Sequence, residues 1–205
     1  MKIATKNLYL AAALAALAVP VMAQDAGAPV DPKPATVHQR KENQQDRIAN
    51  GVQSGQLTAG EAANLEKKEA GINTETRDMR EDNGGKLTNA DRQKLQQQQN
   101  QMSNQIYRDK HNAAVANTNP KSEVGKRAES QQDRIASGIR SGQLTAGEAA
   151  HVETKEAALN KEVHNDRAAN GGKLTSSEKA QVNHQQNNVS KQIYKDKHNG
   201  RRQAR

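Results

Sequence analysis

The sequence contains no cysteine, tryptophan or phenylalanine, and aromatic residues make up only 1% of its 205 positions. Without cysteine the chain can form no disulfide and has no thiol nucleophile. With so few aromatic residues its core must be thin and aliphatic, which leaves no evident dry pocket for acid–base catalysis. A glycine-rich phosphate loop and a zinc-protease histidine pair are also missing. We therefore predict that the protein is not an enzyme, and we expect no cofactor.

The strongest pattern that is present is an internal duplication. Residues 44–112 recur without a gap 87 positions later as residues 131–199, and 41 of these 69 positions are identical. No proline lies inside either copy, as uninterrupted helices require. The many glutamines, asparagines and charged residues would be typical of disorder, but the apolar positions are duplicated too. The sequence therefore predicts an all-α protein of two tandem three-helix units, built from helical hairpins without a β-sheet.

Each copy contains two occurrences of a short motif that ends one helix and begins the next. In the first copy the two occurrences read SGQLTAGE and GGKLTNAD. Glycine accepts the left-handed conformation that closes a helix, and threonine caps the next helix together with an acid three residues later. The predicted cap pairs are Thr58 with Glu61, Thr88 with Asp91, Thr145 with Glu148, and Thr175 with Glu178. The predicted helices cover about residues 37–53, 58–83, 88–111, 124–140, 145–170 and 175–198.

Narrow apolar stripes run along the second and third helices of each unit. The second-helix stripes are Leu65, Ile72 and Met79 in the first copy and Val152, Leu159 and Val163 in the other; the third-helix stripes are Leu95, Met102 and Ile106, matched by Val182, Val189 and Ile193. Stripes of this width suit antiparallel hairpins. So few apolar residues per unit favour packing between the units or self-association. The tract Gln96–Gln101 is expected to form a solvated face.

The chain begins with a pattern typical of an export signal. Lys2 and Lys6 precede an apolar run that ends at the small residue Ala23, after which we expect cleavage. The run is too short for a good membrane span. The predicted order is signal peptide 1–23, proline-rich spacer 24–36, helical repeat 37–112, linker 113–123, helical repeat 124–199 and basic tail 200–205. We expect a periplasmic or secreted protein without a transmembrane span in its mature chain.

The formal net charge of +8 does not come from a basic face. Residues 37–113 hold 12 basic and 11 acidic side chains, residues 124–200 hold 12 and 9, and the tail adds three arginines. Nucleic-acid footprints need basic residues clustered on one element. We therefore expect no specific nucleic-acid partner.

The ending IYRDKHN of the first copy recurs as IYKDKHN and contains the weak metal-ligand candidates, which are Asp109, His111, Asp196 and His198. Residues two apart on a helix do not face each other, whereas Tyr107 and His111 do. We favour a plain helix end in which lysines complement the dipole and the tyrosine packs on a neighbouring helix. The glycine loops do not favour calcium either, because they lack the oxygen ligands of an EF-hand.

The pattern SGQLTAGE, NGGKLT and QIYRDKHN resembles an uncharacterised family of exported bacterial proteins with such repeats. The resemblance covers about three-quarters of the chain. It implies a bacterial envelope or secreted protein, and it implies no activity and no functional residues. A looser likeness is to the periplasmic stress chaperones with LTxxQ motifs, such as Spy and CpxP. An acid replaces the glutamine of that motif here.

Three functions stay open at this point. The first is a non-enzymatic, chaperone-like periplasmic binding protein that acts in envelope stress on protein clients or a partner protein. The second is a metal-ion or polyanion binding protein of the envelope, and the third is a purely structural spacer.

Overall fold

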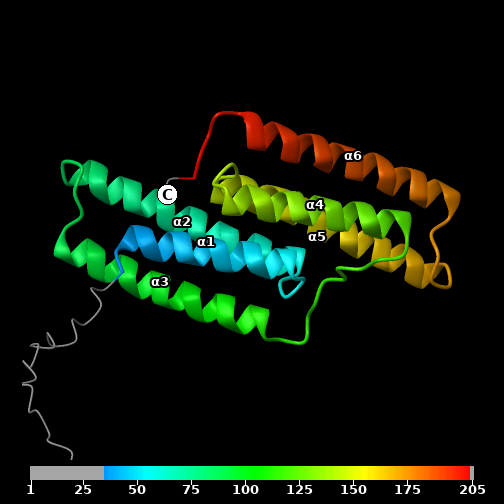
Figure 1. The fold of residues 1–205 in the computed structure, drawn as a ribbon, viewed down its shortest axis with the longest axis horizontal. Helices are drawn as coiled ribbons and strands as arrows, with labels where there is room; N and C mark the ends of the chain where they lie inside the picture. Colours follow the sequence, from blue (N-terminus) through cyan, green and yellow to red (C-terminus); the bar gives the residue numbers. More distant parts are fainter. Residues whose placement is uncertain (1–34, 204–205) are drawn as a thin grey trace, which may run out of the picture. The chain divides into compact units, whose positions relative to one another are not determined.

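A computed structural model describes residues 35–203 of the chain (Figure 1). Over this range there are six α-helices and no strand, so the predicted all-α class is confirmed: α1 (Val37–Gln53), α2 (Ala59–Asp82), α3 (Asn89–Lys110), α4 (Glu123–Arg140), α5 (Ala146–Ala169) and α6 (Ser176–His198). None of these described helices has the length and apolarity needed to cross a membrane. The predicted signal peptide, residues 24–34 of the predicted spacer and the last two residues of the predicted tail lie outside the described range.

All four predicted threonine caps have the geometry of a capping box. At the start of α2, the backbone N–H of Thr58 donates to the Glu61 carboxylate at 2.9 Å, and the Thr58 hydroxyl accepts from the Glu61 backbone N–H at 3.4 Å. The same two bonds join Thr88 with Asp91, Thr145 with Glu148, and Thr175 with Glu178. Sequence reasoning did not find two further caps, Thr36 on α1 and Ser122 on α4. Each cap stabilises its helix by about 1 kcal/mol.

The first helix of each repeat ends where a leucine folds back over its last turn. The backbone N–H of Leu57 donates to the carbonyl of Gly51 at 3.0 Å, and Gly55 between them has a φ of 70°. A Cβ added to Gly51 would lie 2.6 Å from the Leu57 side chain, so only glycine leaves room for this leucine. Gly138 and Leu144 repeat the arrangement with the same 3.0 Å bond. Both leucines are fully buried as a result.

The two repeats pack directly against each other, and the six helices form one compact unit. Helix α2 packs on α5 and α1 packs on α4, and we call these two contacts the repeat interface. Helix α3 packs on α1 and α2, and α6 packs on α4 and α5. Helices α3 and α6 therefore lie on opposite outer sides of the unit (Figure 1).

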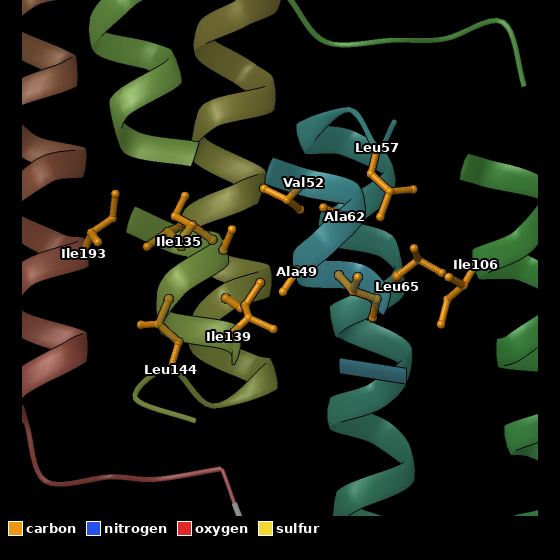
Figure 2. Close-up of a cluster of buried hydrophobic side chains, with 14 of the residues drawn as sticks. Ala49, Val52, Leu57, Ala62, Leu65, Ile106, Ile135, Ile139, Leu144 and Ile193 are labelled. Atoms are coloured by element: carbon orange, nitrogen blue, oxygen red, sulfur yellow. The ribbon is translucent and has the colours of Figure 1, made fainter. Parts of the chain in front are cut away.

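One hydrophobic core crosses the repeat interface. Figure 2 shows Leu65 and Ile106 of the first repeat in the same cluster as Ile139 and Ile193 of the second. Every buried member is at most 5% exposed: Ile48, Ala49, Val52, Leu57, Ala62, Leu65, Met102, Ile106, Ile135, Ala136, Ile139, Leu144, Ala149, Val152, Val189 and Ile193. Much of each predicted apolar stripe is thus covered by the other repeat or by the helices of its own repeat.

The second repeat has a further small cluster at the outer end of its hairpin, which we call the distal cluster. It contains Val124, Leu159, Val163 and Val182, with Leu174 packed against it. In the first repeat Thr76 replaces Val163, and its hydroxyl donates to the Ile72 carbonyl at 2.7 Å. Ile72 and Met79 there remain half-buried. The α2 stripe is therefore fully buried only at Leu65, because the first repeat lacks a matching distal cluster.

Candidate functional site

The repeated ending of the third helices does not bring aspartate and histidine together. The His111 ring stacks on Tyr107, with 4.2 Å between ring centroids, and its Nδ1 lies 2.7 Å from the Tyr107 carbonyl oxygen. Asp109 instead accepts a hydrogen bond from Gln105 at 2.7 Å. Tyr107 and His111 face each other as predicted, but the prediction that the tyrosine packs on a neighbouring helix is wrong. Its side chain is 60% exposed.

The second copy has the same arrangement. Tyr194 and His198 stack at 4.2 Å, and Asp196 accepts from the side chain of Gln192 at 2.8 Å. Across residues 35–203, no three histidine, aspartate or glutamate side chains are grouped in a way that could hold a metal ion. The four metal-ligand candidates thus each have a local partner and do not converge.

The asparagine that closes this ending connects two helices. Asn112 donates from its side chain to the Glu61 carboxylate at 2.5 Å, and Asn199 donates to Glu148 at 2.7 Å. Each asparagine therefore joins the end of the third helix to the capped start of the second. The repeated asparagine of the KHN sequence therefore has a structural role, which is to donate a hydrogen bond to the acid that caps the second helix.

The start of the predicted basic tail is docked on the fold. The backbone N–H of Gln203 donates to the Gly142 carbonyl at 3.0 Å, and its side-chain oxygen accepts from the Ala146 N–H at 3.1 Å. In the linker, Ala116 makes the equivalent backbone bond to Gly55 at 2.8 Å. The Arg201 side chain is 76% exposed, and its guanidinium lies 3.9 Å from the Glu148 carboxylate.

Four glutamates are buried on α2 and α5, the helices that pack on each other across the repeat interface, and we call them the glutamate quartet. They are Glu66 and Glu69 of α2 with Glu153 and Glu156 of α5, and each residue is 0% exposed. Gln45 of α1 donates to one oxygen of Glu66 at 3.2 Å, and Gln132 of α4 donates to one oxygen of Glu153 at 2.9 Å. The remaining six carboxyl oxygens are buried without a hydrogen-bond partner.

Burial changes how these carboxyl groups titrate. Desolvation raises the pKa of Glu153 and of Glu156 to about 8, and it raises the pKa of Glu69 to about 7. It also raises the pKa of Glu66 well above its usual range, and the neighbouring Glu69 and Glu153 add to this shift. The quartet is therefore predominantly neutral at mildly acidic pH.

Sequence reasoning did not find this quartet, although the sequence carries a signal for it. Glu66 and Glu69 follow Leu65 by one and four positions and are identical in the second copy. Positions four apart lie on the same face of a helix, so Glu69 shares the face of Leu65 and Glu66 shares the face of the buried Ala62. A repeated acid on the apolar side of a helix is therefore a candidate buried acid.

A groove of about 990 Å³ lies between the linker, the second repeat and the α1–α2 connection of the first repeat, and we call it the linker groove. Its apolar lining includes Val115, Pro120, Leu159, Val163 and Leu174. Val115 of the linker is 71% exposed, so part of this lining is open to solvent. The charged side chains around it are Lys121, Arg167, Lys173 and Lys179 with Glu123, Glu129 and Asp133.

Comparison with family models, with curated proteins and with solved structures finds no match for this chain.

Proposed function

We propose that the protein is a non-enzymatic binding protein of the bacterial envelope that holds partly unfolded polypeptide segments in the linker groove. The observation that supports this proposal is an apolar lining that stays open to solvent at Val115. Exposed apolar surface rimmed by polar residues is a common mark of a protein interaction site. Such binding is chaperone-like and suits a stress response outside the cytoplasm.

The stripes predicted from the sequence are less suitable as a binding surface. Leu65, Met102 and Ile106 are at most 2% exposed and belong to the shared core. A client could reach them only if the repeats separated. The linker groove needs no such rearrangement, because it already lies at the surface.

The chemistry of the groove suits an extended polypeptide better than a polyanion. Four basic and three acidic side chains line it, so its charges nearly cancel. Asn117 and Asn160 also line the groove and offer amide groups to a peptide backbone. Val115 and the half-buried Leu174 provide the apolar surface that side chains of an unfolded segment would cover.

A client-aggregation assay tests this proposal. The purified protein in molar excess should slow the aggregation of a chemically unfolded model polypeptide, whereas Val115→Asp should lose most of this effect. Val115 is 71% exposed, so its replacement should leave the melting temperature unchanged. If the unmodified protein in molar excess does not slow aggregation, the proposal fails.

The duplication provides a matched control. Leu87 occupies the hairpin position in the first repeat that Leu174 occupies in the second, and both side chains are partly buried. Only Leu174 lines the linker groove. Leu174→Asp should reduce suppression of aggregation, whereas Leu87→Asp should retain it. If both variants lost the suppression of aggregation equally, the loss would reflect destabilisation of the fold and would count against client binding in the linker groove.

Polyanion binding through the tail is the second candidate, and the exposure of Arg201 favours it. Deleting the tail would be a poor test, because Gln203 bonds to Gly142 and Ala146. Replacing Arg201 and Arg202 by glutamine keeps these bonds and removes two of the three arginine charges of the tail. Binding to heparin that weakens steeply with salt, and that this double variant loses, would support this candidate over the groove.

A further inference from the structure

The glutamate quartet lies on the two helices that pack across the repeat interface, and its members come in equivalent pairs. Glu66 on α2 corresponds to Glu153 on α5, and Glu69 corresponds to Glu156. Helices α2 and α5 pack on each other, and the charge of Glu153 acts on Glu66 across this contact. Titration of these acids therefore acts on the contact that joins the repeats.

The hydrogen-bonding groups around the quartet require protons on the carboxyl groups. Next to Glu66, the side-chain oxygen of Gln45 is also buried without a partner, so this site has more acceptors than donors. Glu69 and Glu156 have no partner for either oxygen. A protonated carboxyl group supplies an O–H donor, whereas a carboxylate supplies none.

The charges that face the quartet are too few to neutralise four carboxylates. Lys41 of α1 faces Glu69, and Arg134 of α4 faces Glu156. Glu66 and Glu153 receive only the amide groups of glutamines. Other charged groups lie beside these two cations. Glu42 of α1 and Arg80 of α2 interact with Lys41, and Lys197 of α6 interacts with Arg134. On α3, Lys110 interacts with Arg47 of α1.

We propose that the repeat interface is a proton-dependent joint, which holds the two repeats tightly together while the glutamate quartet is protonated and loosens as the quartet ionises. Burying an ionised carboxylate without a partner is strongly unfavourable, and four of them repel one another. The interface can relieve this cost by opening to water. Opening would also expose Leu65 and Val152, which lie next to Glu66 and Glu153 in the sequence.

The direction of the pH effect follows from the raised pKa values. Above about pH 4.5 an unfolded or separated chain releases these protons, while the packed interface retains them up to the pKa of Glu69 near 7 and of Glu153 and Glu156 near 8. The packed state binds more protons over this range, so its stability falls as the pH rises. The stabilising contribution of Glu69, Glu153 and Glu156 is full below about pH 4.5 and is lost as the pH rises through 7 to 8.

Thermal melts between pH 5 and pH 9, combined with binding of an apolar fluorescent dye, test the proposal. The melting temperature of the purified protein should fall by at least about 5 °C from pH 5 to pH 8. Dye binding below the melting temperature should increase over the same range. Replacing all four members of the quartet by glutamine should largely remove both changes.

Two controls make the result specific. All variants keep every other titratable side chain, so the difference in slope between the unmodified protein and the glutamine variant isolates the contribution of the quartet. Glu81→Gln changes a glutamate whose side chain is 69% exposed and should behave as the unmodified protein. If the quadruple variant does not fold, Glu69→Gln with Glu156→Gln should show a reduced slope. A melting temperature that is flat from pH 5 to pH 8 in the unmodified protein, or an unreduced slope in the folded variants, would overturn the proposal.

Discussion

Gln45 donates a hydrogen bond at 3.2 Å to one carboxyl oxygen of Glu66 inside the protein, and the other oxygen of that carboxyl group has no partner. Gln132 and Glu153 form the same half-satisfied pair in the second repeat. The same buried acid is thus present once in each repeat, next to a core cluster that contains no aromatic side chain. Their burial lowers stability at neutral pH relative to an uncharged residue of the same shape.

Replacing one of these acids by its amide should therefore stabilise the protein at high pH. Burial raises the pKa of Glu153 to about 8, so between about pH 4.5 and 8 the native protein loses stability as the pH rises. Glutamine at this position does not titrate. We expect Glu153→Gln to raise the free energy of unfolding by about 2 kcal/mol at pH 8 and to change it little at pH 5. Urea denaturation at the two pH values measures this, and an equal effect at both would contradict it.

Two glycines on helices should respond in opposite directions to alanine. A Cβ on Gly51 would lie 2.6 Å from the buried Leu57 side chain, whereas a Cβ on Gly71 would meet nothing within 4 Å. We expect Gly51→Ala to lower the free energy of unfolding by about 1–3 kcal/mol through overpacking. Gly71→Ala should raise it by about 0.5–1 kcal/mol, because alanine favours the helix. Melting curves of both variants check the opposite signs.

The distal cluster should make the second hairpin more sensitive to truncation than the first. Leu159 is 3% exposed within that cluster, whereas the equivalent Ile72 is only half-buried. We expect Leu159→Ala to cost about 2–4 kcal/mol and Ile72→Ala to cost about half as much or less. Chemical denaturation of the two variants, compared at matched pH, measures the difference. Equal costs would mean that the two hairpins are packed alike.

Loss of one threonine cap should lower the free energy of unfolding by a predictable amount. The hydroxyl of Thr145 accepts from the Glu148 N–H at 3.3 Å, and its backbone N–H donates to the Glu148 carboxylate at 3.0 Å. Thr145→Ala removes the first bond, so we expect a loss of about 1 kcal/mol. Thr74 is exposed in the middle of α2, and Thr74→Ala should be neutral or slightly stabilising. Thermal melts of the two variants distinguish a cap effect from a general threonine effect.

Zinc should not act through the repeated helix endings. His111 and His198 are each engaged with a tyrosine, and no third ligand faces them. We expect the melting temperature to shift by less than about 1 °C when zinc is added in tenfold excess. A larger shift that disappears in the variant His111→Ala, His198→Ala would restore the metal-binding alternative.

The helices could be predicted from the sequence because the residues that begin and end each helix act on their near neighbours in the chain. A threonine cap such as Thr58 is recognised from the threonine itself and an acid three positions later. A helix-ending turn is recognised from its glycine, because glycine readily adopts the positive φ that the turn requires. The predicted ends accordingly differ from the observed ones by about one residue, as with α2, which begins at Ala59 and not at Thr58. The repeats themselves follow from direct comparison of the two halves of the chain.

The burial of polar residues was not predicted, because it depends on contacts distant in sequence. The tract Gln96–Gln101 was expected to be a solvated face, yet Gln99 is 1% exposed and donates to the Val37 carbonyl at 2.7 Å. That contact spans 62 positions. Glu66 and Glu153 lie on helices that pack across the repeat interface, and the linker groove combines linker residues with residues of both repeats. A pattern within one helix can mark a candidate buried acid, but it does not show which distant residues bury it.

The core that crosses the repeat interface also bears on why both copies are in one chain. A single copy would leave its share of this core, including Ile48 and Leu65, without a partner. Two separate copies could cover it only by associating, so their stability would depend on dilution. The short connection at residues 113–123 turns this association into an intramolecular step with a high effective concentration. Stability then does not depend on how much of the protein is present, which suits a protein that must remain folded when it is scarce.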